Sequence, residues 1–228
     1  MPYGDWSYFM YVIPALLITI AADIYVRSVY RKYSSVRVES GMTGSDAARM
    51  VLSTHGVNDV VIDHVKGDLT DYFNPTDRII RLSDNVYNCA TVSAVGVAAH
   101  ESGHAIQYSE DYLPVKIRSV ITPVTKYGSM AAWPLVLLGV LFEFRPLAWI
   151  GVALFGAAVL FRMLTLPVEI NASRRAIASL SGGIITEEEL KGVKKVLTAA
   201  ALTYVASFAA TLLTFLRILS VARGSRRR

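Results

Sequence analysis

The chain has 228 residues, of which 53% are hydrophobic and only 18% are charged. This is more apolar surface than one soluble core would bury, so the composition argues for a membrane protein and against a soluble globule. The formal net charge is +5, but the lysines and arginines flank apolar runs without interleaved aromatic residues, which argues against a nucleic-acid-binding protein and for charge at membrane boundaries.

Four apolar stretches divide the chain, each near the roughly 20 residues that a helix needs to cross a bilayer. They predict a transmembrane anchor at residues 6–26, two transmembrane helices within residues 119–166, and a last transmembrane helix at residues 196–219. Pro123 and Pro134 should kink the second stretch or let its first part run along the interface. We expect the second stretch to begin near Ser119.

Residues 27–118 have soluble character and predict a small α+β domain. A helix at residues 44–55 begins after a capping residue, Thr43 or Ser45, and ends at Gly56. A second helix begins after Ser83 or Thr91 and leads through small apolar residues to His100. Three short strands are expected between these helices, at residues 60–65, 69–73 and 78–82, with a turn at residues 74–77.

The pattern His-Glu-x-x-His occurs at residues 100–104. Residues four apart lie on one face of a helix, so His100 and His104 are placed to bind one Zn2+, while Glu101 lies beside that face as a general base. Such catalytic zinc sites use three protein ligands and leave a position for water. The single cysteine, Cys89, excludes a site built from several cysteines, so the third ligand must come from elsewhere.

Glu169 is the best placed third ligand, within residues 167–195, which connect the last two apolar stretches. Pro167 is expected to end or kink the third membrane helix, so that Glu169 emerges at its boundary, where a carboxylate beside apolar sequence needs a partner. Zinc is one such partner. A salt bridge to Arg174 or Arg175, or compensation of a helix N-terminus, is the alternative role for this carboxylate.

The chain closely resembles the YugP-type family of neutral zinc metallopeptidases. The resemblance is carried by GVAAHESGHAIQ at residues 96–107 and LPVEINASRRA at residues 166–176, and it covers nearly the whole sequence. More distantly, Glu-x-x-Ala after His-Glu-x-x-His resembles the integral-membrane gluzincins of the HtpX and CAAX peptidase type. This resemblance implies that Glu169 is the third ligand of one Zn2+ per chain, and that residues 167–195 form a third-ligand segment.

The same resemblance suggests the surroundings of the metal. Ser173 stands where the relatives usually carry an aspartate that supports a ligand, and its hydroxyl is able to hydrogen-bond a ligand. The strand that begins at Arg78, with Ile79 and Ile80, is a candidate edge strand for pairing with substrate, and Asn74 is a candidate polar contact. A strand that only completes the sheet, and a turn role for Asn74, are the alternatives. Candidates for stabilising an oxyanion are His64, Tyr72, Tyr108 and Arg162.

These observations predict a mainly α membrane protein with about four transmembrane helices and a small α+β, gluzincin-like catalytic domain at residues 27–118. Its expected function is zinc-dependent endopeptidase activity, in which a zinc-activated water attacks the peptide bond and Glu101 accepts the proton. The alternative function is a membrane scaffold or adaptor with a structural zinc site; a transporter is disfavoured because no paired interrupted repeats are found.

The expected partners are a peptide or protein substrate, a membrane protein being one kind, and the lipid bilayer; no nucleic acid is expected, and an oligomer is left open. The chain is expected to be multi-pass in the cell membrane. Most lysines and arginines near the apolar stretches lie on the side of residues 27–118, which predicts a cytoplasmic catalytic side. Arg223 and the arginines at 226–228 disagree with that side if the last stretch crosses.

Overall fold

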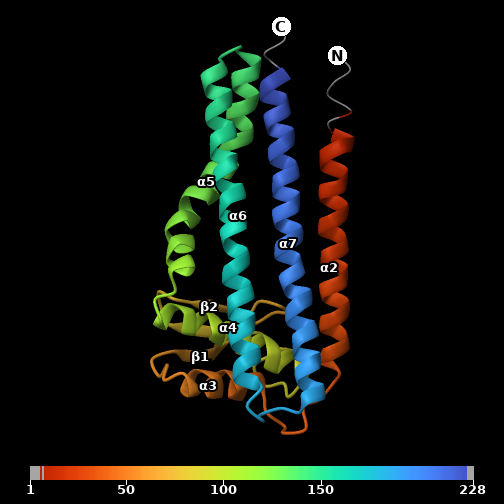
Figure 1. Cartoon of the computed structure of the whole chain (residues 1–228), viewed down its shortest axis with the longest axis vertical. Coiled ribbons are helices and arrows are strands. Elements are labelled where there is room, and N and C mark those ends of the chain that lie inside the picture. Colours follow the sequence, from red (N-terminus) through yellow and green to blue (C-terminus); the bar gives the residue numbers. More distant parts are fainter. Residues whose placement is uncertain (1–5, 7, 225–228) are drawn as a thin grey trace. The chain divides into compact units, whose positions relative to one another are not determined.

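The computed structural model describes residue 6 and residues 8–224 of the chain. The arginines at 226–228 therefore lie outside the described residues. Within the described part, one π-helical turn and six α-helices accompany a small mixed sheet (Figure 1). The elements in chain order are η1 (Tyr8–Val12), α2 (Ile13–Ser34), α3 (Gly44–Thr54), β1 (Val61–His64), β2 (Tyr72–Asn74), β3 (Ile79–Leu82), α4 (Val92–Ser109), α5 (Leu113–Leu141), α6 (Arg145–Leu180) and α7 (Glu187–Gly224).

Four helical segments of the described residues are long and apolar enough to cross a membrane. Each contains a window of mean hydropathy between 1.3 and 2.0, and most residues of these windows are not buried within the protein. Apolar side chains that face outward on a long helix are suited to lipid. The predicted class, a helical membrane protein with a small α+β region, is confirmed. The segments are Tyr8–Ser34, Leu113–Leu141, Arg145–Leu180 and Glu187–Arg223.

Two of these helices pass through prolines that the sequence suggested would interrupt them. The helix α5 contains Pro123 and Pro134 and begins at Leu113, upstream of the expected start at Ser119. The helix α6 continues through Pro167 to Leu180, so of the two outcomes expected at Pro167, a helix end or a kink, the helix end is ruled out. A proline removes only one backbone donor, and the neighbouring hydrogen bonds of a long apolar helix hold the segment together.

The chain forms two compact units. One consists of residues 24–115 and 167–202, and the other of residues 1–23, 116–166 and 203–228. We call the first the motif unit, because it contains the His-Glu-x-x-His pattern, and the second the spanning unit. The domain boundaries expected from the sequence remain predictions, although residues 167–195 share a compact unit with residues 24–115.

The sheet of the motif unit has the strand order β1-β3-β2. The central strand β3 pairs in parallel with β1, where Ile62 lies opposite Ile80, and antiparallel with β2, where Phe73 lies opposite Ile80. Of the two interpretations of residues 78–82, the edge strand is therefore wrong, because β3 is paired on both sides, and the alternative of a strand that completes the sheet agrees with this order. The strand predicted at residues 69–73 is also displaced, because Leu69 has φ 56° in the preceding turn and β2 begins only at Tyr72.

Helix caps position the two helices that pack on this sheet. Thr43 accepts a hydrogen bond from the backbone of Asp46, whose carboxylate accepts in return, so α3 begins with a capping box. Thr91 accepts from the backbone of Ala94 at the start of α4. The segment before α4 is tied to residues after α2 by a bridge between Arg37 and Thr91. The second candidate cap in each pair, Ser45 or Ser83, is not used.

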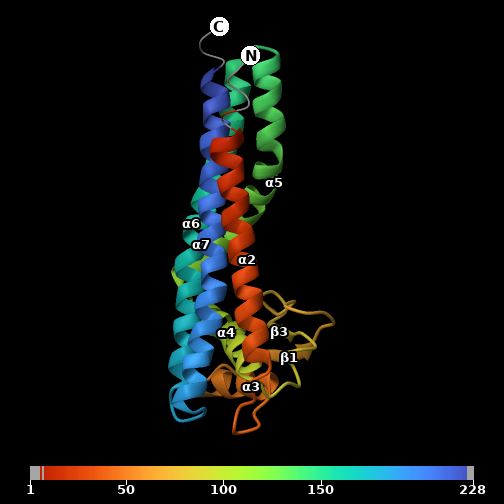
Figure 2. The same ribbon diagram turned by 90° about the vertical axis from the view of Figure 1, so that its right-hand side faces the viewer.

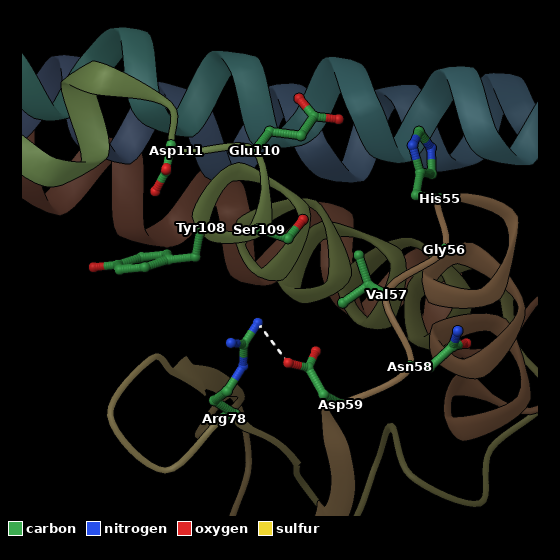
Figure 3. Close-up of a pocket in the computed structure, with 10 residues that line it drawn as sticks. All are labelled: His55, Gly56, Val57, Asn58, Asp59, Arg78, Tyr108, Ser109, Glu110 and Asp111. Atoms are coloured by element: carbon green, nitrogen blue, oxygen red, sulfur yellow. Dashed lines mark ion pairs between the residues drawn. The ribbon is translucent and has the colours of Figure 1, made fainter.

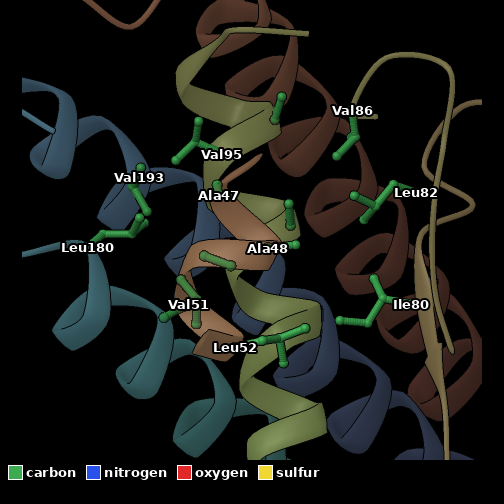
Figure 4. Packing of buried hydrophobic residues seen from close by; sticks show 14 of the residues in the cluster. Ala47, Ala48, Val51, Leu52, Ile80, Leu82, Val86, Val95, Leu180 and Val193 are labelled. Carbon is green, nitrogen blue, oxygen red and sulfur yellow. The ribbon is translucent and has the colours of Figure 1, made fainter. Parts of the chain in front are cut away.

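The core of the motif unit lies between α3, α4 and the sheet, which cluster together in both views (Figures 1 and 2). The close-up in Figure 4 shows apolar side chains of α3 facing those of α4 and β3, with residues of α6 and α7 beside them. Full burial of such side chains is the main favourable contribution to folding. The buried residues include Ala47, Ala48, Val51, Leu52, Ile80, Leu82, Val86, Val95, Leu180 and Val193.

The spanning unit has its own smaller apolar cluster, which includes Val136, Val152 and Ile218. A Cβ added at Gly151 would lie 2.6 Å from the carbonyl oxygen of Ala132, so α5 and α6 approach each other closely here. Small residues at such positions are the usual means by which membrane helices pack.

Candidate metal centre

The helix α4 carries the motif, and a glycine lets it lie against α6. A Cβ added at Gly103 would lie 2.5 Å from the carbonyl oxygen of Ala172, so only glycine permits this approach. Ala98, Ala99 and Ala105 are buried on the same helix. Because α4 and α6 are so close, side chains from both helices meet around His100 and His104.

His100, His104 and Glu169 converge at this contact. The Oε2 atom of Glu169 lies 3.3 Å from Nε2 of His100 and 3.4 Å from Nε2 of His104. Each of the three side chains offers one ligand atom, and these atoms lie within 4.8 Å of one another. A tetrahedral zinc ion with bonds of about 2.0–2.2 Å separates its ligand atoms by roughly 3.3–3.6 Å. The donor set fits zinc, and the two distances to Glu169 match this separation.

The environment of these side chains is negatively charged and largely closed to solvent. Glu169 is 2% exposed within α6, so it does not compensate a helix N-terminus. Burial by itself would lower the pKa of His104, but the carboxylates of Glu169 and Glu101 outweigh it and raise the pKa above its ordinary value. The two carboxylates that favour a positive charge on His104 also favour a metal cation beside it.

Ser173 lies one turn after Glu169 on α6 and contacts His100. Its Oγ atom is 3.1 Å from Nδ1 of His100. When Nε2 faces the metal position, Nδ1 carries the ring proton and donates a hydrogen bond to this hydroxyl. The arrangement is the one that the sequence suggested for Ser173, and its role as a supporting residue stays a proposal.

Sequence reasoning missed the residue that contacts the other histidine. Nδ1 of His104 lies 3.0 Å from Oε1 of Gln107, a side chain that is fully buried. Gln107 follows His104 by three residues on α4, and that helical spacing was the only available signal. The partners of its amide nitrogen, Val168 and Asn171, come from α6.

Glu101 is half-buried on α4, and a second carboxyl group lies within its electrostatic influence. Asp71 accepts hydrogen bonds from the backbone nitrogen of Ser83 at 2.7 Å and from its hydroxyl at 3.0 Å. Burial raises the pKa of Asp71 above its ordinary value, and the negative charge of Glu101 adds to this effect, although the bonds from Ser83 act in the opposite direction. Asp71 is therefore a further acidic group near the motif that sequence reasoning did not identify.

The residues suggested for substrate binding occupy different environments. Ile80 is fully buried in the core, and Ile79 is partly buried. Asn74 is in β2, where its amide accepts from the backbone of Thr76 and donates to Asp77, as in a turn-stabilising role. Their part in substrate binding remains a prediction.

Arg78 lies in a cavity of about 740 Å³ in the motif unit. Figure 3 shows its ion pair with Asp59, which is 2.9 Å long, across the cavity from Tyr108 and Ser109 at the end of α4. Tyr108 follows His104 by one turn and packs edge-on against Phe73 of β2. Of the sequence-based candidates for oxyanion stabilisation, Tyr108 is thus on the same helical face as His100 and His104.

The other oxyanion candidates are engaged or lie elsewhere. His64 contacts Asp84 at 2.7 Å, and the hydroxyl of Tyr72 accepts from Arg81 at 2.6 Å. Arg162 belongs to the spanning unit. His55 contacts Ser179 at 3.0 Å and is not part of the cluster formed by His100, His104 and Glu169.

Comparisons with known proteins agree with the character of this site. Residues 8–223 match a family model described as "Putative neutral zinc metallopeptidase". A protein of Bacillus subtilis (strain 168) described as "Putative membrane protease YugP" is 44% identical over 215 residues, which cover 94% of this chain and 96% of that protein. No solved structure matches the chain with significance.

Proposed function

The chain belongs to the neutral zinc metallopeptidase family whose model it matches over residues 8–223, and from this premise we propose that it is a membrane-embedded, zinc-dependent endopeptidase. The observation that carries the proposal is the convergence of Nε2 of His100, Nε2 of His104 and Oε2 of Glu169 within 4.8 Å. These three donors would hold one zinc ion per chain. In the described residues no fourth donor belongs to the group, which suits a catalytic site better than a closed structural one.

Zinc bound by these side chains would supply positive charge that makes a water molecule more acidic and polarises the scissile carbonyl group. Glu101 is the general base in this proposal. It follows His100 directly and so flanks the metal position, and its charge already acts on His104. Its carboxylate accepts the proton from the attacking water and returns it to the leaving amine, which yields two shorter peptides.

The edge strand β2 is the proposed support for an extended substrate. Among the described residues it pairs only with β3, and it packs against α4, the helix that carries the motif. A peptide that adds to this edge gains backbone hydrogen bonds without a requirement for particular side chains. In this proposal the substrate backbone lies along β2 and not along the strand that begins at Arg78.

We propose that the motif unit faces the cytoplasm, on the basis of the lysines and arginines that flank the apolar helices on its side. Addition of protease to oriented vesicles tests this placement. Cleavage within residues 27–118 is expected only when the cytoplasmic surface is exposed, and cleavage from the opposite surface would overturn it.

The test of the function uses the full chain purified in detergent micelles and an unfolded protein as substrate. The protein with zinc is expected to cleave the substrate, and a chelator should abolish cleavage. The variant Glu101→Gln is expected to retain zinc and thermal stability but to lose activity by about 10²–10⁴-fold, the usual contribution of a general base. A stable Glu101→Gln variant with undiminished activity would contradict the assigned mechanism.

A further inference from the structure

The contact between His104 and Gln107 belongs to a set of side-chain hydrogen bonds that joins α4 to α6. Gln107 is the only glutamine in the sequence and is fully buried. Its Oε1 atom lies 3.0 Å from Nδ1 of His104, while Nε2 of the same ring lies 3.4 Å from Glu169. An imidazole that binds a metal through Nε2 carries its proton on Nδ1, so the amide oxygen of Gln107 is the acceptor for that proton.

The orientation of the Gln107 amide is set by two acceptors on α6. Its Nε2 atom donates to the carbonyl oxygen of Val168 at 2.8 Å and to Oδ1 of Asn171 at 2.9 Å. Both amide protons are therefore used, and a flipped amide would place its oxygen against two other oxygens. Val168 directly precedes Glu169, so one side chain connects His104 with the backbone next to the third proposed ligand.

Asn171 is itself held in one orientation. Its Oδ1 atom also accepts from Nε of Arg175 at 2.8 Å, and Arg175 forms an ion pair of 2.7 Å with Glu110. Glu110 lies just after α4 and lines the 740 Å³ cavity. The set of bonds thus begins at His104 on α4, crosses to α6, and returns to the end of α4. Buried polar groups with all partners satisfied fix a single arrangement of the elements that carry them.

We propose that Gln107 is a positioning residue of the metal centre, which fixes the tautomer and ring orientation of His104 and holds this ring against Glu169. The inference rests on the proposed zinc site and extends it to a residue outside the His-Glu-x-x-His pattern. Together with the hydroxyl of Ser173 on His100, it gives both histidines a neutral hydrogen-bond acceptor. Carboxylate acceptors would add negative charge, so the neutral pair leaves more of the positive charge of the bound metal available to substrate.

Two substitutions separate the contact with His104 from the contacts with α6. Gln107→Met keeps the length of the side chain but removes every hydrogen bond. Gln107→Glu keeps an acceptor for Nδ1 of His104 but loses donation to Val168 and Asn171. Ser102→Ala is the matched control, because Ser102 is also fully buried on α4 and its hydroxyl donates to Ala98 at 2.9 Å, not to a histidine.

For each full-length variant in detergent, zinc affinity is measured by competition with a chromophoric chelator, and the visible spectrum is recorded with Co2+ in place of zinc. Thermal unfolding of the metal-free protein reports stability separately. Gln107→Met should bind zinc about 10–100-fold more weakly than wild type and show an altered Co2+ spectrum. Gln107→Glu should bind zinc at least as tightly as wild type although its metal-free form is less stable, and Ser102→Ala should retain wild-type affinity.

A merely structural role for Gln107 predicts that both variants lose stability and that their zinc affinities and Co2+ spectra stay equal to wild type. That result, or equal weakening of zinc binding in Gln107→Glu and Gln107→Met, would overturn the inference. If Gln107→Met does not fold, the test rests on the zinc affinity of Gln107→Glu compared with that of wild type. Weaker zinc binding by Gln107→Glu would then contradict the proposal. Failure of the wild-type protein to bind zinc would instead refute the proposed function.

Discussion

The two compact units use polar and apolar residues in opposite ways. The motif unit buries polar side chains: the amide of Gln107 on α4 donates to the carbonyl oxygen of Val168 on α6, and the carboxylate of Glu169 on α6 contacts His100 on α4. The spanning unit instead exposes large apolar side chains, such as Val120 at 73% and Leu160 at 62%. Burial of polar groups is costly unless each is paired, whereas many large apolar side chains exposed along a long helix are suited to lipid. The buried polar side chains of the motif unit surround the proposed metal site, whereas the exposed apolar side chains of the spanning unit are suited to the bilayer.

The largest expected effect comes from Glu169→Gln in the motif unit. The substitution keeps the size of the side chain but removes the only carboxylate in the proposed ligand group, so zinc affinity should fall by more than about 100-fold, beyond the loss caused by removal of an outer partner. Metal content after dialysis against a weak chelator measures this. The same substitution at Glu143, an exposed turn residue of the spanning unit, serves as control. Equal zinc content in both variants would contradict the ligand assignment.

A smaller effect is expected from Leu160→Asp in the spanning unit. An aspartate within a membrane helix costs about 2.5–3.5 kcal/mol on insertion scales, so the inserted fraction of α6 should fall. A glycosylation-based insertion assay measures that fraction. Val61→Asp is the matched change in the motif unit, because Val61 is similarly exposed on β1, and it should leave insertion unchanged. Normal insertion of Leu160→Asp would mean that this helix does not face lipid.

Glycine positions sharpen the comparison further. Gly103→Ala would bring a Cβ within 2.5 Å of a backbone oxygen of α6, and we expect a loss of about 1–3 kcal/mol in unfolding free energy together with weaker zinc binding. Gly156→Ala in the spanning unit would place a Cβ at an ordinary 3.5 Å from Phe215, so stability should be unchanged or slightly raised. Thermal unfolding with and without zinc compares the two. Equal tolerance at both positions would refute the close packing of α4 on α6.

The smallest expected effect concerns the capping box of α3. Hydrogen bonds from the side chain and backbone of Thr43 lower the pKa of Asp46, with a smaller contribution from Arg49. Because the pKa is lower in the folded state, the stabilisation is present above the ordinary aspartate pKa near 4 and disappears as the pH falls through the folded pKa. Asp46→Asn should remove this dependence, which is worth about 0.5 kcal/mol or less at an exposed site. Unfolding curves of wild type and Asp46→Asn between pH 3 and 7 measure this pH dependence of the unfolding free energy. A difference well above about 0.5 kcal/mol would contradict the small contribution assigned to the cap.

Local features were predictable from the sequence, and pairings between distant segments were not. The spacing of His100 and His104 follows from helix geometry, and each helix cap could be narrowed to two candidate residues. The central position of β3 depends on the order in which strands meet, which no local pattern encodes, so the edge-strand prediction failed. Pro167 does not end its helix, because its local preference is outweighed by the surrounding helix. Gln107 became recognisable only when α6 supplied Val168 and Asn171 as partners.

The central claim is that His100, His104 and Glu169 hold one zinc ion at an open, catalytic site. An experimental structure with anomalous scattering recorded on both sides of the zinc absorption edge tests it most directly. The predicted result is a single zinc peak at about 2.0–2.2 Å from Nε2 of each histidine and from a carboxylate oxygen of Glu169, with no fourth protein ligand. A peak elsewhere, no peak in zinc-loaded protein, or a fourth protein ligand closing the site would contradict the claim.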